Sequence, residues 1–194
     1  MLMVGLAIGI VGMTLAGKTE VSNFLKSKGF GYVRLGELTE IKLKEAGLEN
    51  TEETNVMVRE KLRKEFGKDA YAKLNLPKIE EKLKKGNVVI DGLYSWSEYK
   101  FFKKKLPRFI TVAVYAPPKV RYERAKTRKE RSVRDYFKHK TPEERDYAEI
   151  ENLEKGGPIA MADYTIMNDK QGFKHLHNEL KKFWGWLKDE QLKT

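Results

Sequence analysis

Short apolar runs alternate with amphipathic segments along the 194-residue chain. Continuous apolar runs are typical of strands that are buried on both faces of a sheet. They predict five strands, at residues 4–11, 31–34, 87–91, 109–115 and 164–167. Between these runs, apolar residues recur every three or four positions, as on one face of a helix. The alternation predicts an α/β fold in three layers (α/β/α), with helices on both faces of a mostly parallel, five-stranded sheet.

Start and stop signals divide the amphipathic segments into helices. We predict helices at residues 19–28, 37–46, 50–66, 69–85, 119–128 and 172–188, and a lysine-rich helical stretch at 100–105. Asn50 with Glu53 resembles a capping box, and Pro77 should kink or divide the helix that contains it. Thr141, followed by a proline and two acids, predicts a further helix start, and Gly156 with the next two residues would end that helix.

Length and composition narrow the class of protein. A chain of this size suits one domain spanning 1–194, with a small helical lid inserted at about 124–147. The absence of cysteine excludes disulfides, thiolate metal ligands and a cysteine nucleophile. The apolar start lacks a basic n-region, and no later run has the length of a membrane span. We therefore expect a cytoplasmic protein without a membrane partner, either a monomer or a homodimer.

The charge of the chain favours polyanionic partners. The formal net charge is +11, from 39 basic and 28 acidic residues, which suits nucleotides and nucleic acids. Much of the excess lies in lysine-rich stretches at 78–85 and 100–105. In such helices the lysine stems cover apolar surface while the charged ends stay in water. A solvated face explains these stretches best, so a nucleic-acid partner is the less favoured alternative.

The most specific signal follows the first apolar run. Residues 12–19 read Gly-Met-Thr-Leu-Ala-Gly-Lys-Thr and fit the pattern G-x-x-x-x-G-K-[ST] at every fixed position. Such a loop directs backbone N–H groups and a helix N-terminus at phosphate oxygens. Lys18 would reach the β- and γ-phosphates, and the Thr19 hydroxyl would bind Mg2+. The predicted nucleotide-binding residues of this loop are Gly12, Thr14, Ala16, Gly17, Lys18 and Thr19.

Two further features suit phosphoryl transfer. Asp91 ends the apolar run 88–90 in the manner of a Walker B acid, and it would share Mg2+ with Thr19. Arginines gather after the fourth predicted strand, at Arg121, Arg124, Arg128, Arg131, Arg134 and Arg145. Planar guanidinium groups suit the negative charge on a transferring phosphoryl group. Arg124 and Arg128 are one helical turn apart, so both would face a nucleotide, and we expect both to be catalytic together with Lys18.

Together these residues resemble the adenylate-kinase-like nucleoside monophosphate kinases, especially a branch that borders on the dephospho-CoA kinases. The likeness spans nearly the whole chain. It rests on the loop at 12–19, Leu35-Gly36-Glu37, Val89-Ile90-Asp91-Gly92, Arg121-x-x-Arg124, Arg145-Asp146 and the segment 162–169. The resemblance implies a P-loop NTPase fold and a kinase that uses ATP and Mg2+ to phosphorylate a small, nucleotide-like acceptor. It also implies that Asn168 and Gly172 border the adenine.

The predicted acceptor site departs from the family pattern. Glu40 and Tyr94 stand where these kinases usually place two arginines that hold the acceptor's phosphate. Arg34, Arg59 and Arg63 are the arginines that would replace them. Tyr94 and Trp96 would stack on a base or a pantetheine-like arm, with ordinary packing as the alternative. We therefore expect AMP to be a poor acceptor. The acceptor-binding residues that we predict are Arg34, Arg59, Asp91 and Tyr94.

The role of Glu37 depends on whether the acceptor is a hydroxyl group or a phosphate group. A hydroxyl acceptor benefits from a general base at the end of the second strand, where Glu37 is predicted, whereas a phosphate acceptor needs none. An acid that simply favours the start of a helix is the equal alternative. A nucleoside monophosphate is the first choice of acceptor, and dephospho-CoA or another hydroxyl-bearing nucleotide is the second. An NTP-dependent RNA-binding or regulatory module that is not a kinase is the alternative from a different class.

Overall fold

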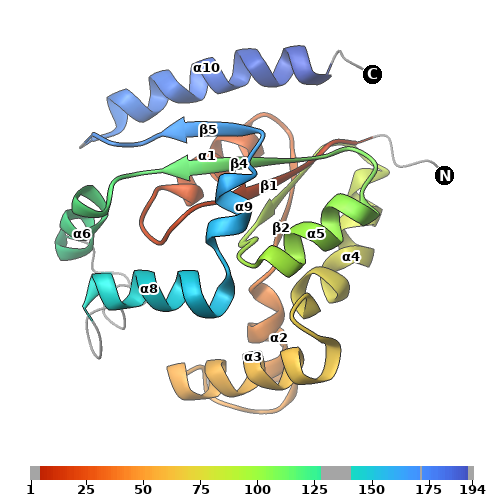
Figure 1. Ribbon diagram of the computed structural model, residues 1–194. Coiled ribbons are helices and arrows are strands. Elements are labelled where there is room, and N and C mark those ends of the chain that lie inside the picture. Colours follow the sequence, from red (N-terminus) through yellow and green to blue (C-terminus); the bar gives the residue numbers. More distant parts are fainter. Residues whose placement is uncertain (1–4, 128–140, 171, 192–194) are drawn as a thin grey trace.

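The computed structural model describes residues 5–127, 141–170 and 172–191. Figure 1 shows strands and helices that alternate along the chain. The strands are β1 (Ala7–Val11), β2 (Gly31–Arg34), β3 (Val88–Asp91), β4 (Phe109–Tyr115) and β5 (Tyr164–Met167). The helices are α1 (Lys18–Ser27), α2 (Glu37–Glu45), α3 (Glu52–Phe66), α4 (Ala70–Leu83), α5 (Trp96–Lys105), α6 (Pro118–Thr127), α8 (Pro142–Leu153), α9 (Gly156–Ala160) and α10 (Phe173–Gln191).

The five strands form one sheet in the order β2-β3-β1-β4-β5, and every neighbouring pair is parallel. All five residues of the central strand β1 are buried. Parallel sheets of this kind need helices on both faces, because their strands expose no solvated side. The predicted α/β fold class is therefore confirmed. The carboxyl ends of all five strands meet at one edge of the sheet, where parallel α/β proteins bind their ligands.

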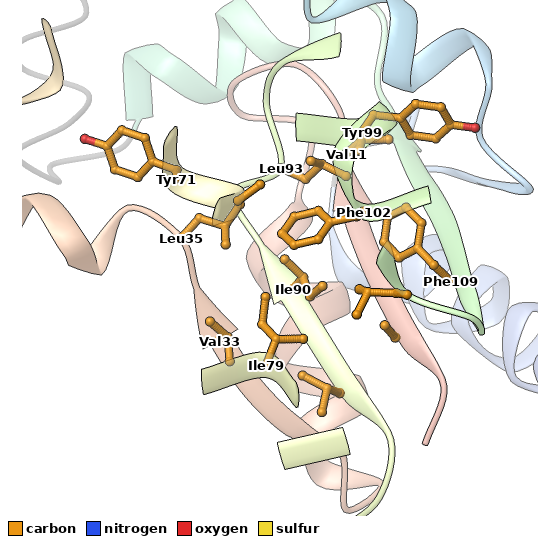
Figure 2. Packing of buried hydrophobic residues seen from close by; sticks show 14 of the residues in the cluster. Val11, Val33, Leu35, Tyr71, Ile79, Ile90, Leu93, Tyr99, Phe102 and Phe109 are labelled. Carbon is orange, nitrogen blue, oxygen red and sulfur yellow. The ribbon is translucent and has the colours of Figure 1, made fainter. Parts of the chain in front are cut away.

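Two apolar clusters fill the space between the sheet and its helices. On one face, α4 and α5 pack on the sheet through Ile79 and Phe102. Figure 2 shows Phe102 beside Phe109 of β4, with ring centroids 5.7 Å apart. On the other face, Leu25 of α1 and Phe183 of α10 are fully buried. Figure 1 shows α10 along β5 on that side. The two clusters give the three layers that the sequence predicts.

The helix boundaries differ from the predictions at several points. The capping box of α3 is formed by Thr51 and Thr54, whose hydroxyls each accept a hydrogen bond from the other residue's backbone N–H, so the prediction of Asn50 with Glu53 was wrong. Pro77 lies inside a single undivided helix. A capping box also starts α5, between Ser95 and Glu98, and extends the lysine-rich stretch toward the N-terminus.

The segment after α8 is the largest correction. The helix starts at the predicted Thr141 cap, with a proline in its first turn. It ends at Leu153, before the glycines, because Glu154 adopts a left-handed conformation with φ of 55°. Gly156 and the next four residues then form the short helix α9, where we predicted only a helix stop. β1 is also shorter than predicted and begins at Ala7.

Some predictions fall outside the described residues. They concern Arg128, Arg131 and Arg134, and the middle of the predicted lid at about 124–147. Among the described residues, no helix combines the length and the apolar character that a membrane crossing requires.

The core makes a first testable prediction. Phe102 is fully buried, whereas its neighbour Phe101 is only partly buried against the same cluster. Phe102→Ala should lower the free energy of unfolding by about 3 to 5 kcal/mol, because it removes a ring and leaves a cavity. Phe101→Ala is the matched control and should cost clearly less. Urea unfolding followed by circular dichroism measures both, and equal losses would contradict this packing.

Candidate nucleotide-binding site

The loop Gly12–Thr19 joins β1 to α1 at the carboxyl edge of the sheet. Gly12 and Gly17 have φ of 140° and 105°, conformations that favour glycine. Space also requires glycine at both positions. A Cβ on Gly12 would lie 2.4 Å from the carbonyl oxygen of Val114, and one on Gly17 would lie 2.4 Å from Asn168 Nδ2. The two glycines therefore let the loop pack against β4 and against Asn168, the residue that follows β5.

Lys18 is the first residue of α1, and its side chain folds back over the loop. Its Nζ donates hydrogen bonds to the carbonyl oxygens of Gly12, at 3.0 Å, and Met13, at 2.9 Å. Burial of the ammonium, and next the positive charge of Lys155, lower the pKa of Lys18 to about 7. A phosphate group would reverse this shift, because a nearby negative charge favours the protonated amine.

Thr19 and Asp91 are the candidate ligands of Mg2+. Thr19 is exposed in the first turn of α1. Asp91 ends β3 and pairs in register with Ile10 of β1, next to the phosphate loop. Its Oδ2 accepts a hydrogen bond of 2.8 Å from the Tyr32 hydroxyl. Burial and this hydrogen bond raise the pKa of Tyr32, so Tyr32 remains a hydrogen-bond donor.

The chemistry of these ligands fits Mg2+. The described residues contain no group of three acidic or histidine side chains that would hold a metal by themselves. Mg2+ is usually bound by one or two protein oxygens together with water and substrate phosphates. One hydroxyl and one carboxylate beside a phosphate loop therefore suit a cation that arrives with a nucleotide.

Arg124 and Asn168 connect three segments of the site. Arg124, on α6, donates to the carbonyl oxygens of Leu15, at 3.2 Å, and Asn168, at 2.8 Å. It also donates to the carbonyl oxygen of Lys170. Asn168 Nδ2 in turn donates to the carbonyl oxygen of Ala16 at 2.8 Å. The structure thus brings the two predicted residues Arg124 and Asn168 to the phosphate loop. Gly172, with φ of 80°, lies in the same connection between β5 and α10.

A buried ion pair joins α6 to α8, and the sequence assigned neither of its residues an individual role. Arg121 forms two hydrogen bonds with the carboxylate of Asp146, of 2.9 and 2.6 Å. Both side chains are nearly inaccessible to solvent. Arg121 also donates to the carbonyl oxygen of Thr14. The pair therefore fixes α8 beside the phosphate loop. The motifs Arg121-x-x-Arg124 and Arg145-Asp146 contain both residues, but nothing in their spacing predicts that they pair.

Glu149 and Lys155 were missed altogether. The Thr14 hydroxyl donates to Glu149 Oε1 at 2.8 Å, and Lys155 Nζ donates to Glu149 Oε2 at 2.6 Å. Burial alone would raise the pKa of Glu149, but Lys155 and the hydrogen bonds outweigh it and lower the pKa. Lys155 is only 4% exposed, and its Nζ lies 4.5 Å from the centre of the Tyr94 ring. Both residues lie in a segment rich in charged side chains, and nothing in its pattern indicates that these two are buried together.

The predicted acceptor residues are distributed unevenly around the site. Arg34 ends β2 opposite Asp91, but it forms an ion pair of 2.6 Å with Glu40. Arg59 pairs with Glu52 at 2.7 Å on the exposed side of α3. Tyr94 lies beneath Lys155, as described above. The structure therefore brings Arg34, Asp91 and Tyr94 to the carboxyl ends of β2 and β3, while Arg59 lies on a separate helix.

Glu37 is also engaged by a cation. Lys78 Nζ on α4 donates to Glu37 Oε2 at 2.7 Å, and both side chains are more than 40% exposed. This hydrogen bond lowers the pKa of Glu37. A carboxylate with a lowered pKa is a weaker base. With Lys78 bound to it, Glu37 is better suited to an ion pair than to the role of a general base.

A shallow, mostly apolar cavity of about 310 Å³ lies close to this edge and is wide open to solvent. It is lined by Trp96, Ile150, Glu154, Gly156 and Gly157. Trp96 stacks on Tyr99 with ring centroids 5.0 Å apart, so the indole is held in place. A Cβ on Gly157 would lie 2.8 Å from the indole ring, so this glycine makes room for the tryptophan. The cavity adjoins Lys155, the residue before Gly156.

Comparison with known proteins places the chain in a family. A family described as "AAA domain" matches residues 8–152. A UPF0200 protein of Thermococcus onnurineus is 37% identical over 169 residues, which cover 82% of this chain and 86% of the relative. A UPF0200 protein of Methanocaldococcus jannaschii is 35% identical over 176 residues, which cover 90% of this chain and 87% of the relative.

Solved structures of kinases share the fold. Shikimate kinase from Acinetobacter baumannii in complex with shikimate has a TM-score of 0.61 and 19% identity, covering 97% of this chain and 96% of that one. Dephospho-CoA kinase from Campylobacter jejuni has a TM-score of 0.54 and 16% identity, covering 94% and 97%. These likenesses show a P-loop kinase fold. The chain belongs to the AAA-domain family and to the UPF0200 proteins.

Proposed function

We propose that this protein is a cytoplasmic phosphotransferase that moves the γ-phosphoryl group of ATP to a small, nucleotide-like acceptor. One observation carries the proposal. The loop Gly12–Thr19, the carboxylate of Asp91 and the guanidinium of Arg124 meet at the carboxyl edge of one parallel sheet. This set supplies the backbone cradle, the metal ligand and the cation that phosphoryl transfer needs.

In this proposal, separate groups of residues bind the nucleotide, hold Mg2+ and stabilise the transferring phosphoryl group. The loop backbone and Lys18 bind the β- and γ-phosphates, and Asn168 with Gly172 borders the base. Thr19 and Asp91 hold Mg2+, which neutralises charge on the phosphates when it is bound. Arg124, and Arg128 beyond the described residues, stabilise charge on the transferring group. Arg124 binds backbone carbonyls in the nucleotide-free protein, so it has to exchange at least one of them for a phosphate oxygen.

The pairing of Arg34 supports an acceptor other than AMP. Arg34 is neutralised by Glu40, the residue that replaces one of the expected arginines. A phosphate that lacks bidentate guanidinium contacts loses charge-assisted hydrogen bonds of about 1.5 to 3 kcal/mol each. AMP is therefore a poor acceptor in our proposal. A larger acceptor would gain contact with Tyr94 and with the cavity beside Trp96.

A hydroxyl acceptor is the second candidate. It requires Glu37 to leave Lys78 and act as the general base, which the observed ion pair opposes. An RNA-binding module remains the alternative from another class, and it would show steep salt dependence without turnover of any small acceptor.

Lys18→Ala tests the proposed function. ATP consumption is measured against a panel of nucleoside monophosphates and dephospho-CoA, and the wild-type protein should turn over at least one acceptor much faster than AMP. Lys18→Ala should reduce this transfer by orders of magnitude, because it removes the charge at the β- and γ-phosphates. The control is Lys26→Ala near the other end of the same helix, whose Nζ donates to Asn23 and lies 4.9 Å from the centre of the Tyr32 ring. Full activity in Lys18→Ala would remove the phosphate loop from the mechanism.

The lowered pKa of Lys18 predicts a pH dependence of nucleotide binding. Above pH 7 the free protein carries a largely neutral Lys18, whereas a bound phosphate favours the protonated form. Binding of Mg–ADP at pH 8 should therefore take up a proton, and the affinity should fall as the pH rises from 7 to 9, by up to about tenfold per unit.

Calorimetry in buffers of different ionisation enthalpy measures this uptake. Lys18→Arg provides the matched control, because a guanidinium stays protonated throughout this range and takes up no proton on binding. The same uptake in both proteins would assign the titration to another group.

A further inference from the structure

The helix α8 buries acids instead of apolar side chains. Asp146 and Glu149 are its buried residues, whereas Tyr147 and Ile150 are 54% and 47% exposed. Asp146 and Glu149 are three positions apart and so share one face of the helix. Buried carboxylates are costly unless cations and hydrogen bonds compensate them. The inner face of α8 is therefore built around the charges of the candidate site.

The two acids are used differently. Asp146 directs both oxygens to the guanidinium of Arg121 in a bidentate pair, and its Oδ2 also accepts a hydrogen bond from the Tyr122 hydroxyl. Glu149 Oε1 accepts a hydrogen bond from the hydroxyl of Thr14 and lies 3.7 Å from Arg145 Nε, while its Oε2 accepts a hydrogen bond from the ammonium of Lys155. The carboxylate of Glu149 thus links the phosphate loop to a lysine on a different segment.

Lys155 is held close to the phosphate loop through Glu149, which also binds Thr14. It is buried, it caps the start of α9, and its Nζ lies over the ring of Tyr94, just after β3. Its positive charge acts on Lys18 strongly enough to lower the pKa of that residue, second only to burial. Two lysines therefore converge on the space in front of the phosphate loop, with the carboxylate of Glu149 close to both.

A carboxylate oxygen and a phosphate oxygen accept the same hydrogen bonds. Each is an anionic acceptor for an ammonium and for a hydroxyl. Glu149 Oε1 and Oε2 bind one donor of the phosphate loop and one lysine, and both donors are groups that can equally bind a phosphate oxygen.

We propose, resting on the function proposed above, that Lys155 is a second phosphate-binding lysine, which contacts the γ-phosphate of ATP. Glu149 is its positioning residue. In the nucleotide-free protein Glu149 stands in for a phosphate oxygen, holding Lys155 and Thr14 until ATP binds. The γ-phosphate then takes over at least the bond from Lys155. ADP has no γ-phosphate, so it leaves the contact between Lys155 and Glu149 in place.

Paired titrations with ADP and with the β,γ-imido analogue of ATP, both with Mg2+, test this inference. The wild-type protein should bind the analogue more tightly than ADP. The double variant Lys155→Met with Glu149→Gln removes both buried charges together, which protects the fold. It should bind the analogue at least about tenfold more weakly and ADP within about threefold of wild type. Lys155→Arg should retain the preference, because a guanidinium also binds phosphate.

Two further variants complete the test. Lys68→Met is the matched control, since Lys68 also pairs with a glutamate, Glu154, but its side chain is 73% exposed. It should leave both affinities unchanged. Glu149→Gln alone keeps Lys155 and removes the competing negative charge, so the analogue should bind more tightly while ADP changes little. Circular dichroism confirms that each variant is folded.

The outcomes separate this inference from the proposed function. If the double variant binds nucleotides with the wild-type ratio of affinities, Lys155 does not contact the γ-phosphate, and the inference is overturned while the proposed function stands. An unchanged affinity for the analogue in Glu149→Gln overturns the role of Glu149. If the wild-type protein binds neither nucleotide, the proposed function fails and the inference fails with it.

Discussion

The phosphate loop keeps its shape because β4, α6 and the residue after β5 pack against it. Val114 approaches Gly12 and Asn168 approaches Gly17 so closely that neither glycine has room for a side chain. Asn168 and Arg124 then bind the carbonyl oxygens of Ala16 and Leu15. These bonds fix two carbonyl groups of the loop in place. A loop fixed in this way is preorganised for an anion, which lowers the cost of binding it.

Electrostatics explain why so many buried charges gather at this edge. Arg121 and Lys155 are cations withdrawn from water, and each is paired with a carboxylate on α8. Such an arrangement is rarely the most stable way to fill a protein interior. It is, however, well suited to a ligand with several negative charges, because the cations are already desolvated and oriented. The acids of α8 compensate these cations while no ligand is bound, and the core proper lies elsewhere, on the two faces of the sheet.

The sequence predicts the layers of this fold and the phosphate loop because both depend on local patterns. Apolar runs mark the strands, and the loop motif follows one of them directly. The cap of α3 was misplaced by one residue because Asn50 and Thr51 are both good cap residues, and only the observed hydrogen bonds choose between them. The start of α9 was missed because two glycines and a proline usually mark a stop.

The charged cluster could not be predicted in the same way. Thr14 and Glu149 are 135 residues apart, and their contact depends on how α8 docks across the end of the sheet. Lys155 lies in a segment rich in charge, where a solvated lysine is the ordinary interpretation. Likewise, the candidate roles of Arg34 and Glu37 rested on their places at the end of β2. Their partners, Glu40 and Lys78, become visible only when α2 and α4 are in position.

The central claim is that the γ-phosphoryl group of ATP leaves this protein attached to an acceptor. Phosphorus NMR of Mg–ATP, incubated with the protein and with each member of a nucleotide panel, observes that event directly. We predict that the γ-phosphate signal decays while signals of ADP and of one new phosphorylated product rise in equal amounts, and that Lys18→Ala abolishes the change. Release of inorganic phosphate alone with every acceptor, or an ATP spectrum that never changes, would contradict the claim.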